Sequence, residues 1–149
     1  MKITEPDALW NALERVRALS FVAESDTRTG WCGAGAGLVA VSGTADTLVF
    51  AETGTWRTVA GAELGFRNTY RWTRLAHSLR LDHLRFGESE PVYLFDLAAH
   101  GNGVWESVTA HQCRDDEYAA RLHHENGIIH LLWTVSGANK SERIAYVYS

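Results

Sequence analysis

The stretch that decides the fold is LGFRNTYRWTR, which runs from Leu64 to Arg74. It alternates between an aromatic-rich set and a polar set: Phe66, Asn68, Tyr70 and Trp72 against Arg67, Thr69, Arg71 and Thr73. Successive side chains of an extended chain point to opposite faces, so a period of two predicts a half-buried strand. The aromatic-rich face carries more apolar area, and we therefore expect it to point inward.

The opposite orientation of this strand remains an alternative. It would turn Arg67 and Arg71 inward, where two guanidinium groups could bind an anionic ligand. They could instead form buried ion pairs with Asp96 or Glu52.

Similar segments lie on both sides of this stretch, separated by turn signals at the short intervals typical of all-β meanders. They make nine or ten predicted strands: Ala18–Ser25, Gly37–Ser42, Thr47–Thr53, Leu64–Arg74, Ser78–Phe86, Val92–Ala98, Val104–His111, Glu117–His124, Ile128–Val135 and Glu142–Tyr148. No long helical crossover separates them, which excludes parallel βαβ units. An antiparallel up-and-down barrel would close this meander without exposed edges, and a two-sheet sandwich is the alternative.

Two local signals add detail to this all-β prediction. Thr4-Glu5-Pro6-Asp7 is typical of a helix start, and the apolar residues after it predict one helix over about residues 5–17. Asn126-Gly127 predicts a two-residue hairpin turn, across which His124 and His130 could lie close together. The chain is expected to form one domain over residues 1–149, with strands over about residues 18–148.

Composition excludes several classes of function. The net charge of −4 argues against nucleic-acid binding, which needs a basic surface. The N-terminus resembles no signal peptide and no apolar run could span a membrane, so we expect a cytoplasmic protein. Two cysteines give no disulfide framework. The glycine-rich tract Trp31–Gly37 lacks both the third glycine and the following helix of a nucleotide motif, and predicts a loop or a thin, bulged strand.

The second half of the chain resembles an uncharacterised bacterial family of calycin-type, lipocalin-like barrels of unknown function. The resemblance spans about residues 48 to 149 and rests on these residues: Phe50, Glu52, Gly54, Asn68–Trp72, Leu79–Phe86, Phe95–Leu97, His111, Cys113, Asp116, Tyr118, Trp133–Gly137, Lys140, Tyr146 and Tyr148. The chain departs from the family pattern at Val92-Tyr93-Leu94 and at Ala138. The resemblance implies a calycin-like barrel with an interior, and it implies no reaction.

The leading functional hypothesis is the binding of a small, largely apolar molecule inside the barrel. Apolar walls with a few placed polar groups are typical of ligand pockets. The candidate ligand-binding residues are Phe66, Asn68, Tyr70, Trp72, Phe95, Trp105, His111, Tyr118 and Trp133. A plain packed core, with no cavity, is the alternative for the same residues.

Three other functions remain open at this point. The barrel could be an enzyme that uses His111 or Tyr118 as acid or base on a lipid-like substrate, although a non-enzymatic role is favoured. It could hold haem through one histidine, or act as an interaction module that pairs through a sheet edge or forms a homodimer. His111 and Cys113 share one face of an extended chain, but zinc needs three or four ligands, so no metal or cofactor is predicted.

Overall fold

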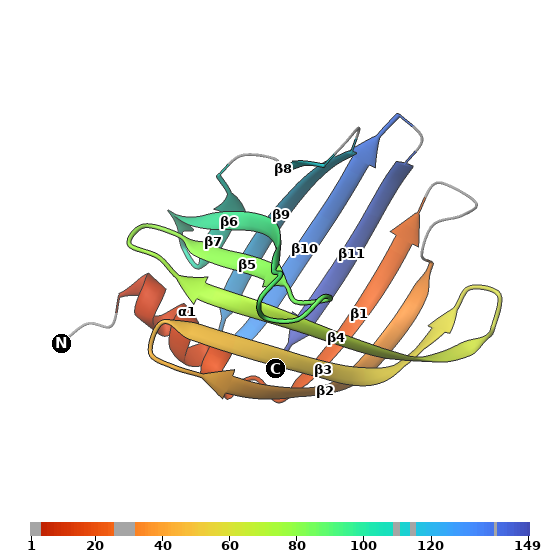
Figure 1. The fold of residues 1–149 in the computed structure, drawn as a ribbon, viewed down its shortest axis with the longest axis horizontal. Coiled ribbons are helices and arrows are strands. Elements are labelled where there is room, and N and C mark those ends of the chain that lie inside the picture. Colours follow the sequence, from red (N-terminus) through yellow and green to blue (C-terminus); the bar gives the residue numbers. More distant parts are fainter. Residues whose placement is uncertain (1–3, 26–31, 109–110, 114–115, 139) are drawn as a thin grey trace.

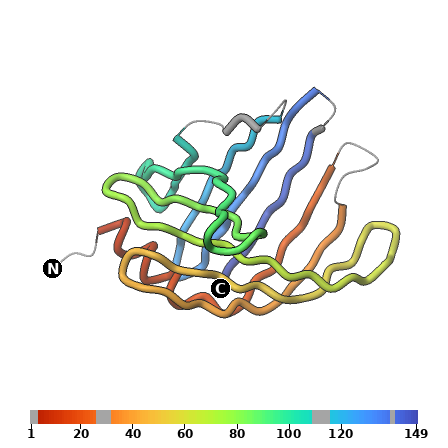
Figure 2. Tube along the Cα trace, viewed as in Figure 1, coloured from red at the N-terminus to blue at the C-terminus, as the bar shows by residue number. Residues whose placement is uncertain are grey.

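A computed structural model describes residues 4–25, 32–108, 111–113, 116–138 and 140–149 of the chain (Figures 1 and 2). Within these residues there is one helix, α1 (Glu5–Arg15). The strands of the described residues are β1 (Ala18–Ser25), β2 (Gly33–Gly43), β3 (Thr47–Thr58), β4 (Glu63–Arg74), β5 (Leu79–His83), β6 (Val92–Gly101), β7 (Val104–Ser107), β8 (His111–Cys113), β9 (Asp116–Glu125), β10 (Ile128–Gly137) and β11 (Lys140–Tyr148).

Ten of these strands close into an antiparallel barrel in which nearly all neighbours in space are also neighbours in sequence. The first and last strands pair, with Leu19 of β1 opposite Tyr148 of β11. The three-residue β8 adds to the barrel beyond the end of β7, because both strands pair with different parts of β9. The predicted all-β, up-and-down barrel with an N-terminal helix is thus confirmed.

Several predicted boundaries differ from the observed ones. The helix ends at Arg15 rather than near residue 17, because Val16 is extended (ψ 133°) and its N–H bonds back to the Leu13 carbonyl. The glycine-rich tract belongs to β2 from Gly33 onward, so its interpretation as a loop is wrong for this part. The strand predicted over Val104–His111 is divided between β7 and β8.

Two hairpins have the tight turn that their sequences require. Asn126 (φ 52°) and Gly127 (φ 78°) both have positive φ, and the flanking residues Glu125 and Ile128 pair directly. This is the geometry of a type I′ turn, whose twist matches that of the strands it joins. The predicted Asn-Gly hairpin is therefore present. Asn102-Gly103 makes an equivalent turn between β6 and β7.

The helix packs against one end of the barrel, opposite the loop between β3 and β4 (Figure 1). Its buried face consists of Leu9, Trp10, Ala12 and Leu13 and joins the barrel core. The ion pair between Arg74 and Asp7 holds the helix to the end of β4. Within the described residues, no helix has both the length and the apolar character needed to cross a bilayer.

The helix start gives a first testable prediction. The Thr4 hydroxyl accepts a hydrogen bond from the backbone N–H of Asp7 and so satisfies one of the free donors of the first turn. Thr4→Ala should lower the free energy of unfolding by about 1 kcal/mol in urea titrations, whereas Thr4→Ser should retain most of it. Equal losses in both variants would show that the hydroxyl does not cap the helix.

Strand β4 is paired on both sides over only part of its length. Tyr70–Thr73 pair with β5 as well as β3, whereas Glu63–Thr69 pair with β3 alone, apart from a bond from the Leu84 N–H to the Thr69 carbonyl. The free half of β4 lies at the end of the barrel away from the helix. This end is therefore the open one.

Candidate functional site: a cavity at the open end of the barrel

A cavity of about 420 Å³ lies at the open end. It is enclosed by six strands, including the free half of β4. Its lining residues are Phe21 and Ala23 of β1, Trp56 of β3, Gly65–Asn68 and Tyr70 of β4, Tyr118 of β9, Trp133 and Val135 of β10, and Glu142, Ile144 and Tyr146 of β11. The barrel is thus hollow at this end, and a plain packed core does not describe it.

Trp133 is the centre of the aromatic wall. Its ring lies 5.4 Å from the ring of Phe95, 5.9 Å from Tyr70 and 6.1 Å from Tyr146, measured between centroids. The rings of Phe95 and Tyr70 meet Trp133 edge to face, an arrangement that gains energy beyond the area that the rings bury. The indole Nε1 of Trp133 is buried and has no hydrogen-bond partner among the described residues. A buried donor without an acceptor is costly, and a bound molecule with an acceptor group would satisfy it.

Glu52 lies behind the residues that line this cavity and does not itself line it. It is fully buried at an inward position of β3, directly opposite Asn68 of β4, which lines the cavity. The Tyr148 hydroxyl donates a 2.6 Å hydrogen bond to its Oε2 atom. Its Oε1 atom is buried with no partner among the described residues. One oxygen of this carboxyl group is therefore hydrogen-bonded, and the other has no hydrogen-bond partner among the described residues.

The electrostatics around Glu52 follow from its burial. Removal from water raises the pKa of Glu52 to about 7, and the Tyr148 hydrogen bond offsets only part of this effect. Burial raises the pKa of Tyr146 to about 12 and those of Tyr70 and Tyr148 well above their usual value. The Tyr70 and Tyr146 hydroxyls are hydrogen-bonded to each other. At neutral pH the three tyrosines are therefore neutral while Glu52 is near its titration midpoint.

Half-buried His83 stacks on the ring of Tyr70 at 4.7 Å. Its pKa is lowered by burial and by the charge of Arg85. His83 is thus a neutral neighbour of this cluster at neutral pH, and it adds a flat face to the wall behind Tyr70.

The predicted ligand-binding residues fall into four groups. Those that line the open cavity are Phe66, Asn68, Tyr70, Tyr118 and Trp133. Trp72 and Phe95 are each 1% exposed in the core beneath it. Trp105 lies at the helix end of the barrel. The side chain of His111 lies outside the described part of the chain, although its backbone pairs with Tyr118.

The aromatic face of β4 does point inward, with Tyr70 and Trp72 both buried. Arg71 lies on the other face and pairs with Asp82 at 3.3 Å, so it does not reach the interior. The alternative partners proposed for an inward arginine are otherwise engaged: Asp96 binds Arg80 at 2.8 Å, and Glu52 binds Tyr148. The inverted orientation of this strand is therefore wrong.

Sequence reasoning overlooked Glu52, Tyr146 and Tyr148 as site residues. The signal for Glu52 was present, because it follows Leu48 and Phe50 at every second position of a predicted strand. An acidic residue on the inward face of an apolar strand is a candidate functional group.

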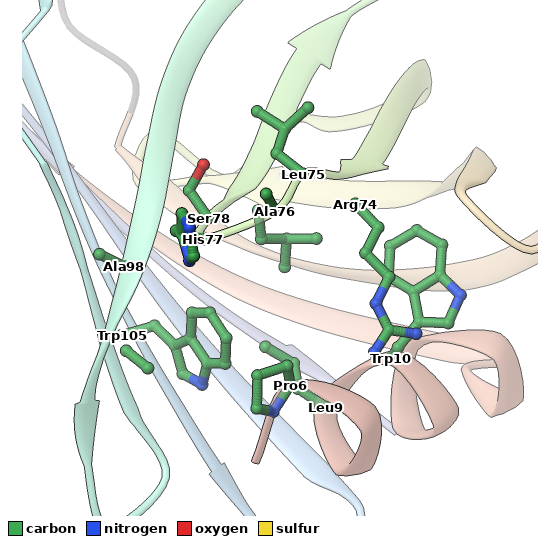
Figure 3. Close-up of a pocket in the computed structure, with 12 residues that line it drawn as sticks. Pro6, Leu9, Trp10, Arg74, Leu75, Ala76, His77, Ser78, Ala98 and Trp105 are labelled. Carbon is green, nitrogen blue, oxygen red and sulfur yellow. The ribbon is translucent and has the colours of Figure 1, made fainter. Parts of the chain in front are cut away.

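A second cavity, of about 340 Å³, lies at the helix end (Figure 3). It is formed by α1, the turn between β4 and β5, and β6 and β7. Trp105 and Pro6 line one side of it, and Leu75 and His77 of the turn lie opposite (Figure 3). The guanidinium of Arg74 lies over the Trp10 ring at 5.8 Å, beside this cavity. No buried carboxyl group lines it.

The histidine pair differs from its prediction. His123, not His124, lies opposite His130, with the two rings 6.2 Å apart, while His124 lies opposite Ile129. The reason is the two-residue turn, which pairs Glu125 with Ile128 and so fixes the register. Among the described residues, no group of three or more histidine, cysteine or acidic side chains is arranged to hold a metal ion.

Comparison with known families identifies the family of this chain. A family model described as a family of unknown function, DUF6314, matches residues 21–149. The chain belongs to this family. The match begins within β1 and covers every strand that follows, and it leaves out helix α1. No curated protein and no solved structure matches the chain significantly.

Proposed function

We propose that the protein binds a small, largely apolar molecule in the cavity at the open end of the barrel. One observation supports this most: a cavity of about 420 Å³ has aromatic walls, and Trp133 at their centre has a buried indole N–H that no described residue accepts from. Ligand pockets of this size combine apolar walls with a few polar groups that fix orientation. The free half of β4 forms part of the rim of this cavity, and a molecule could enter past it.

An uncharged, apolar fluorescent probe tests this proposal. N-phenyl-1-naphthylamine should bind with a dissociation constant in the micromolar range and gain fluorescence as it leaves water. Phe66→Ala removes one cavity wall and should weaken binding about tenfold, because its ring supplies a large apolar contact. The measurement is a fluorescence titration of each variant.

Two matched variants locate the site. Phe86→Ala removes an exposed ring that lines neither cavity, and should leave the affinity unchanged. Leu75→Ala alters the cavity at the helix end and should also leave it unchanged. A loss confined to Leu75→Ala would move the site to the helix end, and no binding at all would refute the proposal.

Finer assignments stay predictions. They are membership of the calycin-type barrels, a bacterial origin, a cytoplasmic location and homodimer formation. An enzyme that uses His111 and Tyr118 stays a prediction as well. Tyr118 lines the open cavity, which is compatible with that role, but the side chain of His111 lies outside the described residues.

A further inference from the structure

We infer that the molecule bound at the open end carries a protonated nitrogen, which pairs with Glu52 beneath the lining of the cavity. The inference rests on the proposed function and deepens it, because it names the chemical class of ligand: an amphiphilic amine or a related organic cation. Three features of the cavity and its surroundings carry it.

The first feature is the incomplete hydrogen bonding of Glu52. As an anion, it has an Oε1 atom whose lone pairs meet no donor among the described residues. As a neutral acid, with Oε2 accepting from Tyr148, it has an Oε1 proton without an acceptor. Both states thus leave one group unsatisfied in the interior, which is costly. An ammonium group at Oε1 would supply the missing donor and the missing charge.

The second feature is the surroundings of this oxygen. Glu52 lies opposite Asn68 in the β3–β4 pair and close enough to Tyr70 and Tyr146 to interact with both electrostatically. The ring of Trp133 contacts both tyrosines in turn. Electron-rich faces of tyrosine and tryptophan attract cations, most strongly where water is excluded. No cationic side chain of the described residues is paired with Glu52. The site is therefore acidic and aromatic.

The third feature is the rim. The two charged residues that line the cavity there are Arg67 and Glu142, with opposite charges. They favour neither an anionic nor a cationic ligand on entry. Selection between the two must then occur deeper in the barrel, where Glu52 would repel a carboxylate ligand and pair with an ammonium ligand.

Three probes of equal chain length test the inference: octylamine, 1-octanol and octanoate. Trp56 and Trp133 line the cavity, so intrinsic fluorescence reports occupancy. At pH 8.5 octylamine should bind at least about tenfold more tightly than octanol, and octanoate should bind most weakly, as expected for one desolvated ion pair. Glu52→Gln should reduce the preference for the amine over the alcohol to within about twofold.

Proton release gives an independent readout. The groups that face Glu52 are Tyr70 from β4 and Tyr146 and Tyr148 from β11, whose raised pKa values keep them neutral between pH 6.5 and pH 8.5. His83 lies behind Tyr70, and its lowered pKa keeps it mostly neutral there. Octylamine stays protonated in this range, like lysine. With the Glu52 pKa at about 7, calorimetry in buffers of different ionisation enthalpy should detect about half a proton released per bound octylamine at pH 7. The apparent affinity should rise about fourfold from pH 6.5 to pH 8.5.

A matched control separates charge from folding. Asp82→Asn neutralises the other buried carboxyl group, which lies outside the cavity and pairs with Arg71, and should leave the preference for octylamine intact. Circular dichroism melts establish that each variant is folded. Equal binding of octylamine and octanol, a preference that survives Glu52→Gln, or tighter binding of octanoate would each overturn the inference while the apolar probe still binds. Failure of the apolar probe itself would overturn the proposed function.

Discussion

Replacing Glu52 by glutamine should make the protein progressively more stable than the wild type as the pH rises from 4.5 to 8. Glu52 is fully buried, and its pKa rises from 4.5 to about 7 in the folded state. The unfolded chain releases this proton above pH 4.5, whereas the folded chain keeps it until about pH 7. Wild-type stability is therefore lost across this interval and levels off above it. The stability difference between variant and wild type should change by about 3 kcal/mol in total.

Urea unfolding of both proteins at a series of pH values between 4.5 and 8.5 measures this difference. The lowered pKa values of His83 and His124 affect both proteins equally and cancel in the comparison. The control is Glu88→Gln, which lies on an exposed turn and should run parallel to the wild type at every pH. A constant difference between Glu52→Gln and the wild type would mean that Glu52 ionises normally, and would remove the electrostatic basis of the proposed cation site.

This expected result matters because stability and function point in opposite directions at Glu52. A neutral residue of the same shape could accept the Tyr148 hydrogen bond without the cost of a buried charge. A carboxyl group placed beneath a cavity, with one oxygen bare, is a local inconsistency of the kind that functional sites show. The same substitution is expected to remove the preference for amines over alcohols. The unfolding and binding experiments on Glu52→Gln therefore measure the stability cost and the functional gain of the same carboxyl group.

Much of the fold could be predicted from local patterns. The alternation from Phe66 to Trp72 identified the inward face of β4, and Asn126-Gly127 identified a two-residue hairpin turn. Such patterns depend on neighbours in sequence, and antiparallel meanders are built mostly from neighbours in sequence. Closure followed because an open sheet of this many strands would leave two edges exposed.

The site itself depends on contacts that no local pattern contains. Glu52 and Tyr148 are 96 residues apart in the chain and meet only because closure brings β3 and β11 across the interior from each other. Likewise, Trp105 and Trp133 are both aromatic residues of predicted strands, yet they lie at opposite ends of the barrel. The stagger between strands decides which end a residue reaches, and the stagger is a property of the closed barrel.

Gly54→Val should be the most damaging single substitution at the open end, with a loss of at least about 3 kcal/mol in the free energy of unfolding. Gly54 occupies an inward position of β3, where β2 and β4 both approach closely. A Cβ atom there would clash with the backbone carbonyl of Ala36, and would lie 2.7 Å from the Cα of Gly37 and 2.8 Å from the Phe66 ring. Two of these three neighbours are backbone, so relief requires the β2–β3 ladder to separate.

Gly65→Val on the adjacent strand is the matched control, since a Cβ there would have its nearest neighbour at 3.9 Å. It should change stability by less than about 1 kcal/mol, and urea titrations of both variants provide the comparison. Equal losses would show that β2 and β3 can separate at little cost. The contrast also bears on function, because the Phe66 ring rests on the bare backbone of Gly54 and forms a wall of the cavity. Any Gly54→Val molecules that do fold must displace this ring, so their affinity for the apolar probe should fall along with their stability.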